Sequence, residues 1–151
     1  MLIDTANSER FGEIFPHVEN ILHCGLYNFN AQTKLMSWSK GVYSILGIDE
    51  STPSTEENFY KFINPECIDL VTSAFKKTIV NKVPYQLEFS VTNAKGLHKR
   101  LYAENYLLFD AAGQMTEYNG VLKDITESYY YKRALEQKIQ QLDKSNRNLQ
   151  E

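Results

Sequence analysis

The sequence predicts an α+β domain: a five-stranded antiparallel sheet with helices on one face, preceded by an N-terminal helix and followed by a long C-terminal helix. Apolar residues recur at helical spacing in residues 5–22 and 65–81, whereas they alternate with polar residues over 85–125. All seven glycines lie at or before Gly120 and all four prolines at or before Pro84, so turn-forming residues are absent from the end of the chain. These observations indicate one α+β body with a helix outside it.

The N-terminal part of the chain predicts one helix and two short strands. Apolar side chains recur at helical spacing through residues 5–22, and Pro16 inside this run predicts a kink or a break. The strands are expected at residues 24–30 and 34–38, on either side of a polar turn.

Three further helices are expected before the main strands. Residues 40–46 form a small apolar-faced helix, and Ser54-Thr55-Glu56-Glu57 resembles a capping box that opens the next one. Asn64-Pro65 then predicts a helix start, with the amide as cap and the proline in the first turn. The apolar spacing that follows predicts an amphipathic helix over residues 65–81.

The second half of the body predicts three long strands in a meander. Alternation of apolar and polar residues indicates strands at 85–92, 99–109 and 114–125. Residues 93–96 and 110–113 have the composition of the turns that join them.

These elements carry, in order, motifs similar to those of the PAS sensor fold with its C-terminal PAC part. The motifs are Trp38-Ser39 leading to Ile45-Leu46-Gly47-Ile48, Ile63-Asn64-Pro65-Glu66, Glu88-Phe89 before Lys95-Gly96, and Gly120-Val121-Leu122-Lys123-Asp124-Ile125-Thr126-Glu127. The last is the most specific, because a final strand that runs into Asp-Ile-Thr and a long helix is the usual end of a PAS domain.

The resemblance covers residues 20–127. It implies a PAS/PAC sensor domain at residues 23–126, after a helical flank at residues 1–22, with Asp124, Ile125 and Thr126 as the signal exit. One departure is that Lys99-Arg100-Leu101 replaces the tryptophan that is common at the start of the second long strand.

Residues 127–151 predict a signalling coiled-coil helix. Heptad position a falls on Ile125, Lys132, Ile139 and Asn146, and position d on Ser128, Leu135, Leu142 and Leu149. A single polar residue such as Asn146 at position a fixes a two-stranded register at a cost in stability. We therefore expect a homodimer through Leu135, Ile139, Leu142, Asn146 and Leu149, with the N-terminal helix as a second contact. The alternative is an amphipathic helix docked on its own sheet.

Residues 142–151 resemble the linker before the phosphoacceptor helix of bacterial sensor histidine kinases. In that family a phosphorylated histidine and an ATP-binding domain follow, and this sequence includes neither. The resemblance implies a sensing and dimerisation module of a two-component phosphorelay, which is not itself an enzyme and is part of a longer chain with a kinase domain. One alternative is a PAS interaction module without ligand, in a transcription regulator or a cyclase. Another is a small ligand-modifying enzyme, for which no catalytic constellation is evident.

No cofactor is expected. PAS domains that bind haem resemble one another in having an axial histidine on their longest helix. Residues 65–81 contain no histidine, so the resemblance does not imply haem here. The light-sensing flavin class carries Asn-Cys-Arg, and Cys67 has neither neighbour. His17, His23 and His98 fall on separate elements, which disfavours a metal site.

An unknown small ligand would lie on the inner face of the sheet. The candidates for lining its pocket are Phe75, Tyr85, Leu87, Phe89, Leu107 and Val121. A register error of one residue would turn a strand candidate to the opposite face.

Charge and composition exclude other classes of protein. A net charge of −3 disfavours nucleic acid as a partner. No apolar run approaches the ~20 residues of a membrane span, so none is expected in this segment. Cys24 and Cys67 do not form a disulfide framework, which favours the cytoplasm.

Overall fold

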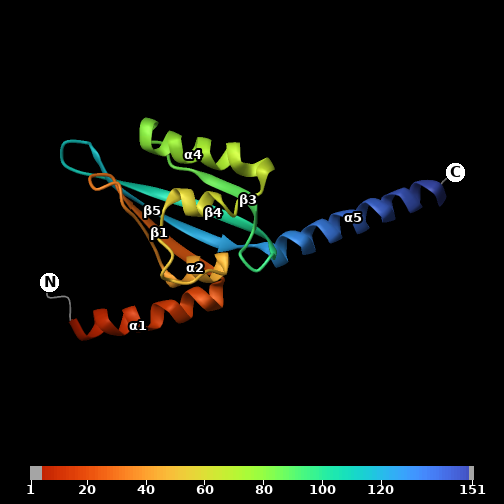
Figure 1. Cartoon of the computed structure of the whole chain (residues 1–151). Coiled ribbons are helices and arrows are strands. Elements are labelled where there is room, and N and C mark those ends of the chain that lie inside the picture. The colour runs from red at the N-terminus through yellow and green to blue at the C-terminus, as the bar shows by residue number, and fades with distance from the viewer. Residues whose placement is uncertain (1–4, 150–151) are drawn as a thin grey trace.

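The computed structural model describes residues 5–149 and shows the predicted α+β architecture (Figure 1). The elements in chain order are α1 (Thr5–Leu22), β1 (Cys24–Asn30), β2 (Met36–Trp38), α2 (Lys40–Leu46), α3 (Glu56–Tyr60), the 3-10 turn η1 (Pro65–Cys67), α4 (Ile68–Asn81), β3 (Gln86–Thr92), β4 (His98–Phe109), β5 (Met115–Asp124) and α5 (Thr126–Leu149).

The five strands form one antiparallel sheet in the order β2-β1-β5-β4-β3. The chain crosses from β2 at one edge to β3 at the other through α2, α3 and α4, and these helices pack over one face of the sheet (Figure 1). α1 lies beside α2, while α5 extends away from the body.

The hydrophobic core lies between the sheet and helices α2 to α4. Its largest fully buried side chains come from both layers and are those of Tyr118, Phe89, Leu46, Leu101 and Leu122. Among the described residues 5–149, none of the helices combines the length and the apolar character that a membrane crossing requires.

Two glycines bring α2 into direct contact with β1. A Cβ atom placed on Gly25 would lie 2.3 Å from the backbone nitrogen of Val42. A Cβ atom on Gly41 would lie 2.0 Å from the carbonyl oxygen of Cys24. Neither position has room for a side chain, so the two backbones touch.

Two local predictions for the helices need correction. α1 is one 18-residue helix that continues through Pro16, so of the predicted kink or break the break is wrong. The hydroxyl of Thr55, not of Ser54, caps α3 by accepting a hydrogen bond from the Asn58 amide at 3.1 Å. The cap is thus shifted by one residue, and Glu57 lies one position before the capped amide.

The start of α4 also differs from its prediction. Asn64 stands before the first turn, but its side chain does not cap the helix. Its Oδ1 accepts a hydrogen bond from Thr92 Oγ1 at 2.9 Å, which connects this corner to the end of β3. Residues Pro65–Cys67 form a 3-10 turn, and the α-helix begins at Ile68.

Candidate functional site

The interior of the body contains a small apolar cavity. It has a volume of about 20 Å³ and is lined mainly by aromatic side chains, among them Tyr27, Trp38, Phe59, Phe75 and Phe89. A cavity must offer about 10–15 Å³ on the same measure to hold one water molecule. In this packing the interior therefore admits about one molecule of that size.

The predicted pocket candidates fall in three kinds of place. Phe75 and Phe89 line the cavity, and Tyr85 is buried beside Phe75, with ring centroids 5.2 Å apart. Leu87 and Leu107 are partly buried and pack against the core.

Val121 points out of the other face of the sheet. It is 38% exposed, whereas its neighbour Leu122 is 2% exposed and lines the cavity. The side chains of β5 that face inward are those of Tyr118 and Leu122, with Gly120 between them covered by the Tyr27 ring. Because Gly120 has no side chain, the sequence does not display the alternation along β5, and the prediction for Val121 is wrong by one residue in phase.

A cluster of tyrosine hydroxyls lies next to the cavity. The hydroxyls of Tyr27 and Tyr85 are hydrogen-bonded to each other across 58 positions of sequence. Asn105 supports them from β4, because its Oδ1 accepts a hydrogen bond from the Tyr85 amide at 2.7 Å. The Asn105 amide group in turn donates to Thr78 Oγ1 at 3.3 Å.

The hydroxyl of Tyr118 is buried without a hydrogen-bond partner among the described residues. Its ring stands edge-on to that of Tyr27, with centroids 6.3 Å apart, and stacks on Phe29 at 5.0 Å. Burial raises the pKa of Tyr27, Tyr85 and Tyr118 well above the ordinary tyrosine value, so all three are neutral and can donate. Sequence reasoning identified Tyr85 but did not connect it with Tyr27.

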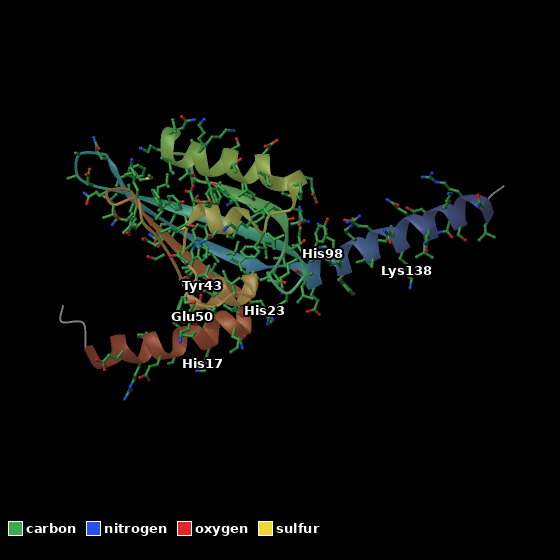
Figure 2. All side chains as sticks on the ribbon, in the orientation of Figure 1. His17, His23, Tyr43, Glu50, His98 and Lys138 are labelled. Carbon is green, nitrogen blue, oxygen red and sulfur yellow. The ribbon has the colours of Figure 1, made fainter. Side chains whose placement is uncertain are left out.

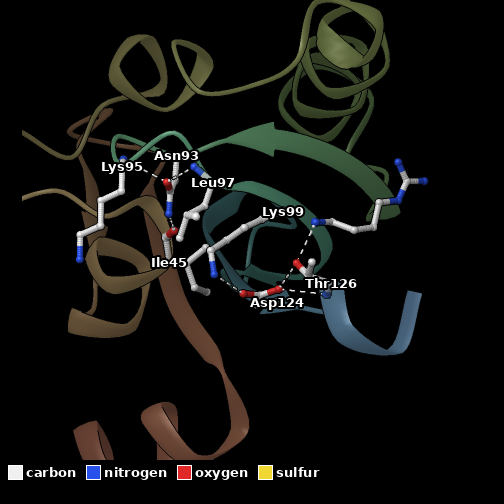
Figure 3. Close-up of polar contacts among 8 residues, drawn as sticks. Ile45, Asn93, Lys95, Leu97, Lys99, Asp124 and Thr126 are labelled. Carbon is white, nitrogen blue, oxygen red and sulfur yellow. Dashed lines mark hydrogen bonds and ion pairs between the residues drawn. The ribbon is translucent and has the colours of Figure 1, made fainter. Parts of the chain in front are cut away.

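The predicted signal exit is a compact group of polar contacts where β5 passes into α5 (Figure 3). Asp124 Oδ1 accepts from both the amide and the hydroxyl of Thr126, and its Oδ2 accepts from Lys99 Nζ at 2.7 Å. Thr126 Oγ1 also accepts from the Arg100 amide at 3.0 Å, and Ile125 donates its amide to the Arg100 carbonyl at 2.9 Å. We call this group, Lys99, Arg100, Asp124, Ile125 and Thr126, the exit clamp.

The exit clamp also sets the charge state of its carboxylate. Burial by itself would raise the pKa of Asp124, but the Lys99 ammonium and the Thr126 hydroxyl and amide outweigh it, so the pKa lies below its ordinary value. The Asp124 amide donates to the carbonyl of His23 at 2.8 Å, just before β1. The clamp thus joins the start of β4, the entry to β1 and the first turn of α5.

Helix α5 has no buried residue along its described length. The predicted dimer residues Leu135, Ile139, Leu142 and Leu149 are 49%, 50%, 57% and 81% exposed, and Asn146 is exposed as well. The alternative of a helix docked on its own sheet is therefore not what the structure has.

The histidines and cysteines do not gather. His17 lies on α1 and His98 near the first turn of α5 (Figure 2), and within residues 5–149 no three His, Cys, Asp or Glu side chains are close enough to hold a metal ion. Cys67 is buried, and its Sγ accepts from the Ser90 amide at 3.4 Å. Burial and the neighbouring Glu19 raise the pKa of the Cys24 thiol, which disfavours a reactive thiolate.

Comparison with known proteins agrees with this geometry. A family model described as the PAS fold matches residues 35–122, which is more than half of the chain. The sensor protein FixL of Bradyrhizobium diazoefficiens is 24% identical over 111 residues, which covers 74% of this chain and 22% of that protein. The chain thus spans about a fifth of the length of this curated relative.

Solved structures with the same fold come from several signalling proteins. A sensory box histidine kinase/response regulator from Burkholderia thailandensis has a TM-score of 0.65 at 22% identity, over 87% of this chain and 98% of that chain. The N-terminal domain of a diguanylate cyclase with a PAS/PAC sensor from Marinobacter aquaeolei has a TM-score of 0.63 at 16% identity, over 70% of this chain and 98% of that chain. At these identities the similarity shows a shared fold.

Proposed function

The chain belongs to the PAS fold family, and on that premise we propose that it is the sensing and dimerisation module of a bacterial two-component sensor histidine kinase. The module itself is non-catalytic. It passes a change induced by a ligand or a partner through α5 to a kinase domain elsewhere in the parent chain. We place it in the cytoplasm and assign it no nucleic-acid partner.

The observation that most supports this proposal is the exit clamp. Asp124 is the last residue of the sheet and Thr126 is the first residue of α5. The two residues are hydrogen-bonded to each other and to β4. A shift of β4 against β5 would therefore break or re-form contacts at the base of α5. Such a discrete change is what a two-state signalling element requires.

The input end of this path is the tyrosine cluster. Tyr118 and Tyr27 face the interior from the two neighbouring strands β5 and β1, and Tyr85 precedes β3. A ligand that bonds to the unpartnered Tyr118 hydroxyl, or that separates the Tyr27–Tyr85 pair, would act directly on β5, the strand that leads to Asp124. Leaving a buried hydroxyl without a partner costs roughly 1–3 kcal/mol of stability. A ligand that forms a hydrogen bond with the Tyr118 hydroxyl would recover this free energy on binding.

The output end is the exposed apolar stripe of α5. Its leucines and Ile139 face solvent in the single chain, and a second copy of α5 would bury them at heptad spacing. Asn146 at position a would then hold the two helices in register. The N-terminal helix is a second contact in this dimer, because its apolar residues are also exposed.

The dimer can be tested with two double variants of equal charge. Leu135→Lys with Leu142→Lys changes the proposed interface, whereas Gln137→Lys with Gln141→Lys adds the same charge at heptad positions f and c. We expect analytical ultracentrifugation to give dimers for the wild type and the glutamine variant and monomers for the leucine variant. A monomeric wild type, or a leucine variant that still forms dimers, would contradict the proposed role of α5.

The kinase assignment has a separate test in the gene that encodes the parent chain. A phosphoacceptor-histidine helix encoded directly beyond Glu151 would support it. A cyclase or a DNA-binding domain at that place would overturn it and leave the sensor and dimer roles to be judged by the first experiment.

A second candidate is a PAS interaction module that binds no ligand, in a transcription regulator or a cyclase. The small volume of the cavity favours it, because about 20 Å³ leaves little space for an organic molecule without side-chain movement. Native mass spectrometry of the gently purified protein distinguishes the two. Extra mass of a bound compound supports the sensor, and its consistent absence supports the interaction module.

A further inference from the structure

A second, open cleft lies on the outside of the body, where α5 leaves the sheet. It has a volume of about 340 Å³, at the lower end of the range for small-molecule sites. Its walls come from the start of η1, from β3 and β4, and from the first two turns of α5. We call it the junction cleft and define it by Ser90, His98, Arg100, Tyr130 and Arg133.

Two guanidinium groups of the junction cleft share one aromatic ring. The Cζ atom of Arg100, on β4, lies 4.9 Å from the ring centroid of Tyr129, and that of Arg133, on α5, lies 5.6 Å from the same centroid. Both arginines, together with Lys99, line the same cleft although they come from different elements. Cationic side chains that line one cleft give it a positive potential, which favours an anion there.

Arg100 makes few of the bonds that it can make. A guanidinium has five N–H donors, but the side chain of Arg100 makes one hydrogen bond, from Nη1 to Ser90 Oγ at 3.0 Å. Its contact to Glu88 is an ion pair at 3.8 Å, beyond hydrogen-bond length, and its Nε is buried without a partner. The side chain as a whole is 22% exposed and lines the cleft, so its remaining N–H donors can bond to an anion there.

Arg133 is exposed and lines the cleft. Its guanidinium donates to the Tyr129 hydroxyl at 3.3 Å. The ion pairs within residues 5–149 are Lys99–Asp124 and Arg100–Glu88, so Arg133 has no carboxylate partner there. The opposing charge in the lining of the cleft is Glu66, whose carboxylate accepts from the Asn64 amide group at 3.5 Å.

We propose that the junction cleft binds a small phosphate-bearing organic anion, with its phosphate bound by Arg100 and Arg133 and its organic part against Tyr130. Planar guanidinium groups match phosphate oxygens in pairs, and a phosphate monoester offers three such oxygens with a charge near −2. A carboxylate offers only two oxygens and one charge to the two arginines. Tyr130 is 53% exposed and supplies an apolar ring at the open side.

A bound phosphate would connect α5 to the sheet by a second route beside the exit clamp. Arg100 belongs to the clamp through its backbone, and Arg133 lies seven residues into α5. The anion would therefore fix the angle at which α5 leaves the body. The proposal that the cleft binds an anion does not depend on the proposed signalling function. The proposal that this anion affects signalling does rest on that function.

The test uses the full chain and two arginine variants on the same helix. Arg133→Gln removes one side of the site, and Arg147→Gln removes an equal charge in the last turn of α5. Phenyl phosphate, inorganic phosphate and benzoate are titrated by calorimetry, and by NMR with the His98 and Tyr130 signals as local reporters. We expect phenyl phosphate to bind in the range of about 1 mM or tighter, with affinity at least about tenfold lower in Arg133→Gln and unchanged in Arg147→Gln.

Three outcomes would overturn the proposal: no binding of phenyl phosphate, equal loss in the two variants, or equal affinity for benzoate. The third would make the cleft a general carboxylate site, and the second would reduce it to unspecific charge attraction. Inorganic phosphate binding as tightly as the phenyl ester would remove the part played by Tyr130. The leucine variant of α5 separates this test from the dimer, because it should still bind phenyl phosphate as a monomer.

Discussion

The body and the two terminal helices differ in how much of their apolar surface is buried. The body buries its large apolar side chains between the sheet and α2–α4, whereas α5 buries no residue along its described length. α1 resembles α5, because its apolar side chains from Phe11 to Leu22 are 38–73% exposed. Apolar side chains are thus buried within the body and exposed to solvent on both helices. Exposed apolar surface of this kind is typical of interaction sites, which is why we propose that both helices bind partners.

Among residues 9–22 of α1, whose side chains are described, the one buried side chain is polar. Glu19 is 2% exposed and accepts a hydrogen bond from the hydroxyl of Ser39, at the start of α2. Ser39 Oγ also accepts from the Leu26 amide at 2.8 Å, so the contact extends to β1. α1 is therefore fastened by a polar contact while its apolar stripe remains free.

The largest difference between the body and α5 is expected in the free energy of unfolding when a leucine is truncated to alanine. Leu101→Ala removes a fully buried side chain and should lower the free energy of unfolding by about 2–5 kcal/mol. Leu142→Ala should leave the unfolding of the body within about 0.5 kcal/mol of the wild type. Urea unfolding followed by the fluorescence of Trp38, the single tryptophan, measures both in the same domain. Equal losses would mean that α5 and the body unfold as one unit.

An intermediate effect is expected at the attachment of α1. Glu19→Ala deletes the buried carboxylate and should weaken the local protection of α1 amides by roughly 1–2 kcal/mol. Glu13→Ala, an exposed change on the same helix, should alter nothing. Hydrogen exchange of α1, with the melting temperature of the body as reference, reports both. A fall in the melting temperature as large as the local effect would show that α1 is part of the core unit.

The smallest effect has the opposite sign. Tyr118→Phe removes a hydroxyl that has no partner and should stabilise the body by about 1 kcal/mol, the low end of the cost of leaving a buried hydroxyl unpartnered. Tyr85→Phe breaks the bond to Tyr27 and should destabilise it by about 1 kcal/mol. Urea unfolding of the two variants gives the comparison. If Tyr118→Phe is instead clearly destabilising, a water or a ligand bonds to the Tyr118 hydroxyl in solution.

Most of the architecture followed from local rules that the sequence displays directly. The change from helical spacing to alternation at Pro84 marks the start of the meander, and Asp124 with Thr126 marks the end of the sheet. These features depend on residues within a few positions of each other, so they can be identified without tertiary structure. The exposed stripe of α5 follows from heptad spacing in the same way.

The parts that could not be predicted depend on contacts between distant segments. Tyr27 and Tyr85 meet only because β1 and the start of β3 face the same interior, and nothing local marks the pair. Glu19 looks like an ordinary surface carboxylate until Ser39 is brought beside it. Val121 and Leu122 are both apolar, so their sequence does not show which of them faces the core. The position of Gly120 on the inner face, under the Tyr27 ring, shows that it is Leu122.

The backbone contact between Gly25 and Gly41 bears on the size of molecule that the cavity could accept. Val42, next to Gly41, lines the cavity, so the distance between α2 and β1 sets how far that wall stands from the sheet. A single methyl group at either glycine would force the helix outward along its length, which trimming one lining side chain cannot do. We therefore expect the size of molecule that descendants of this chain accept to be governed by these two positions more than by the aromatic residues that surround the cavity.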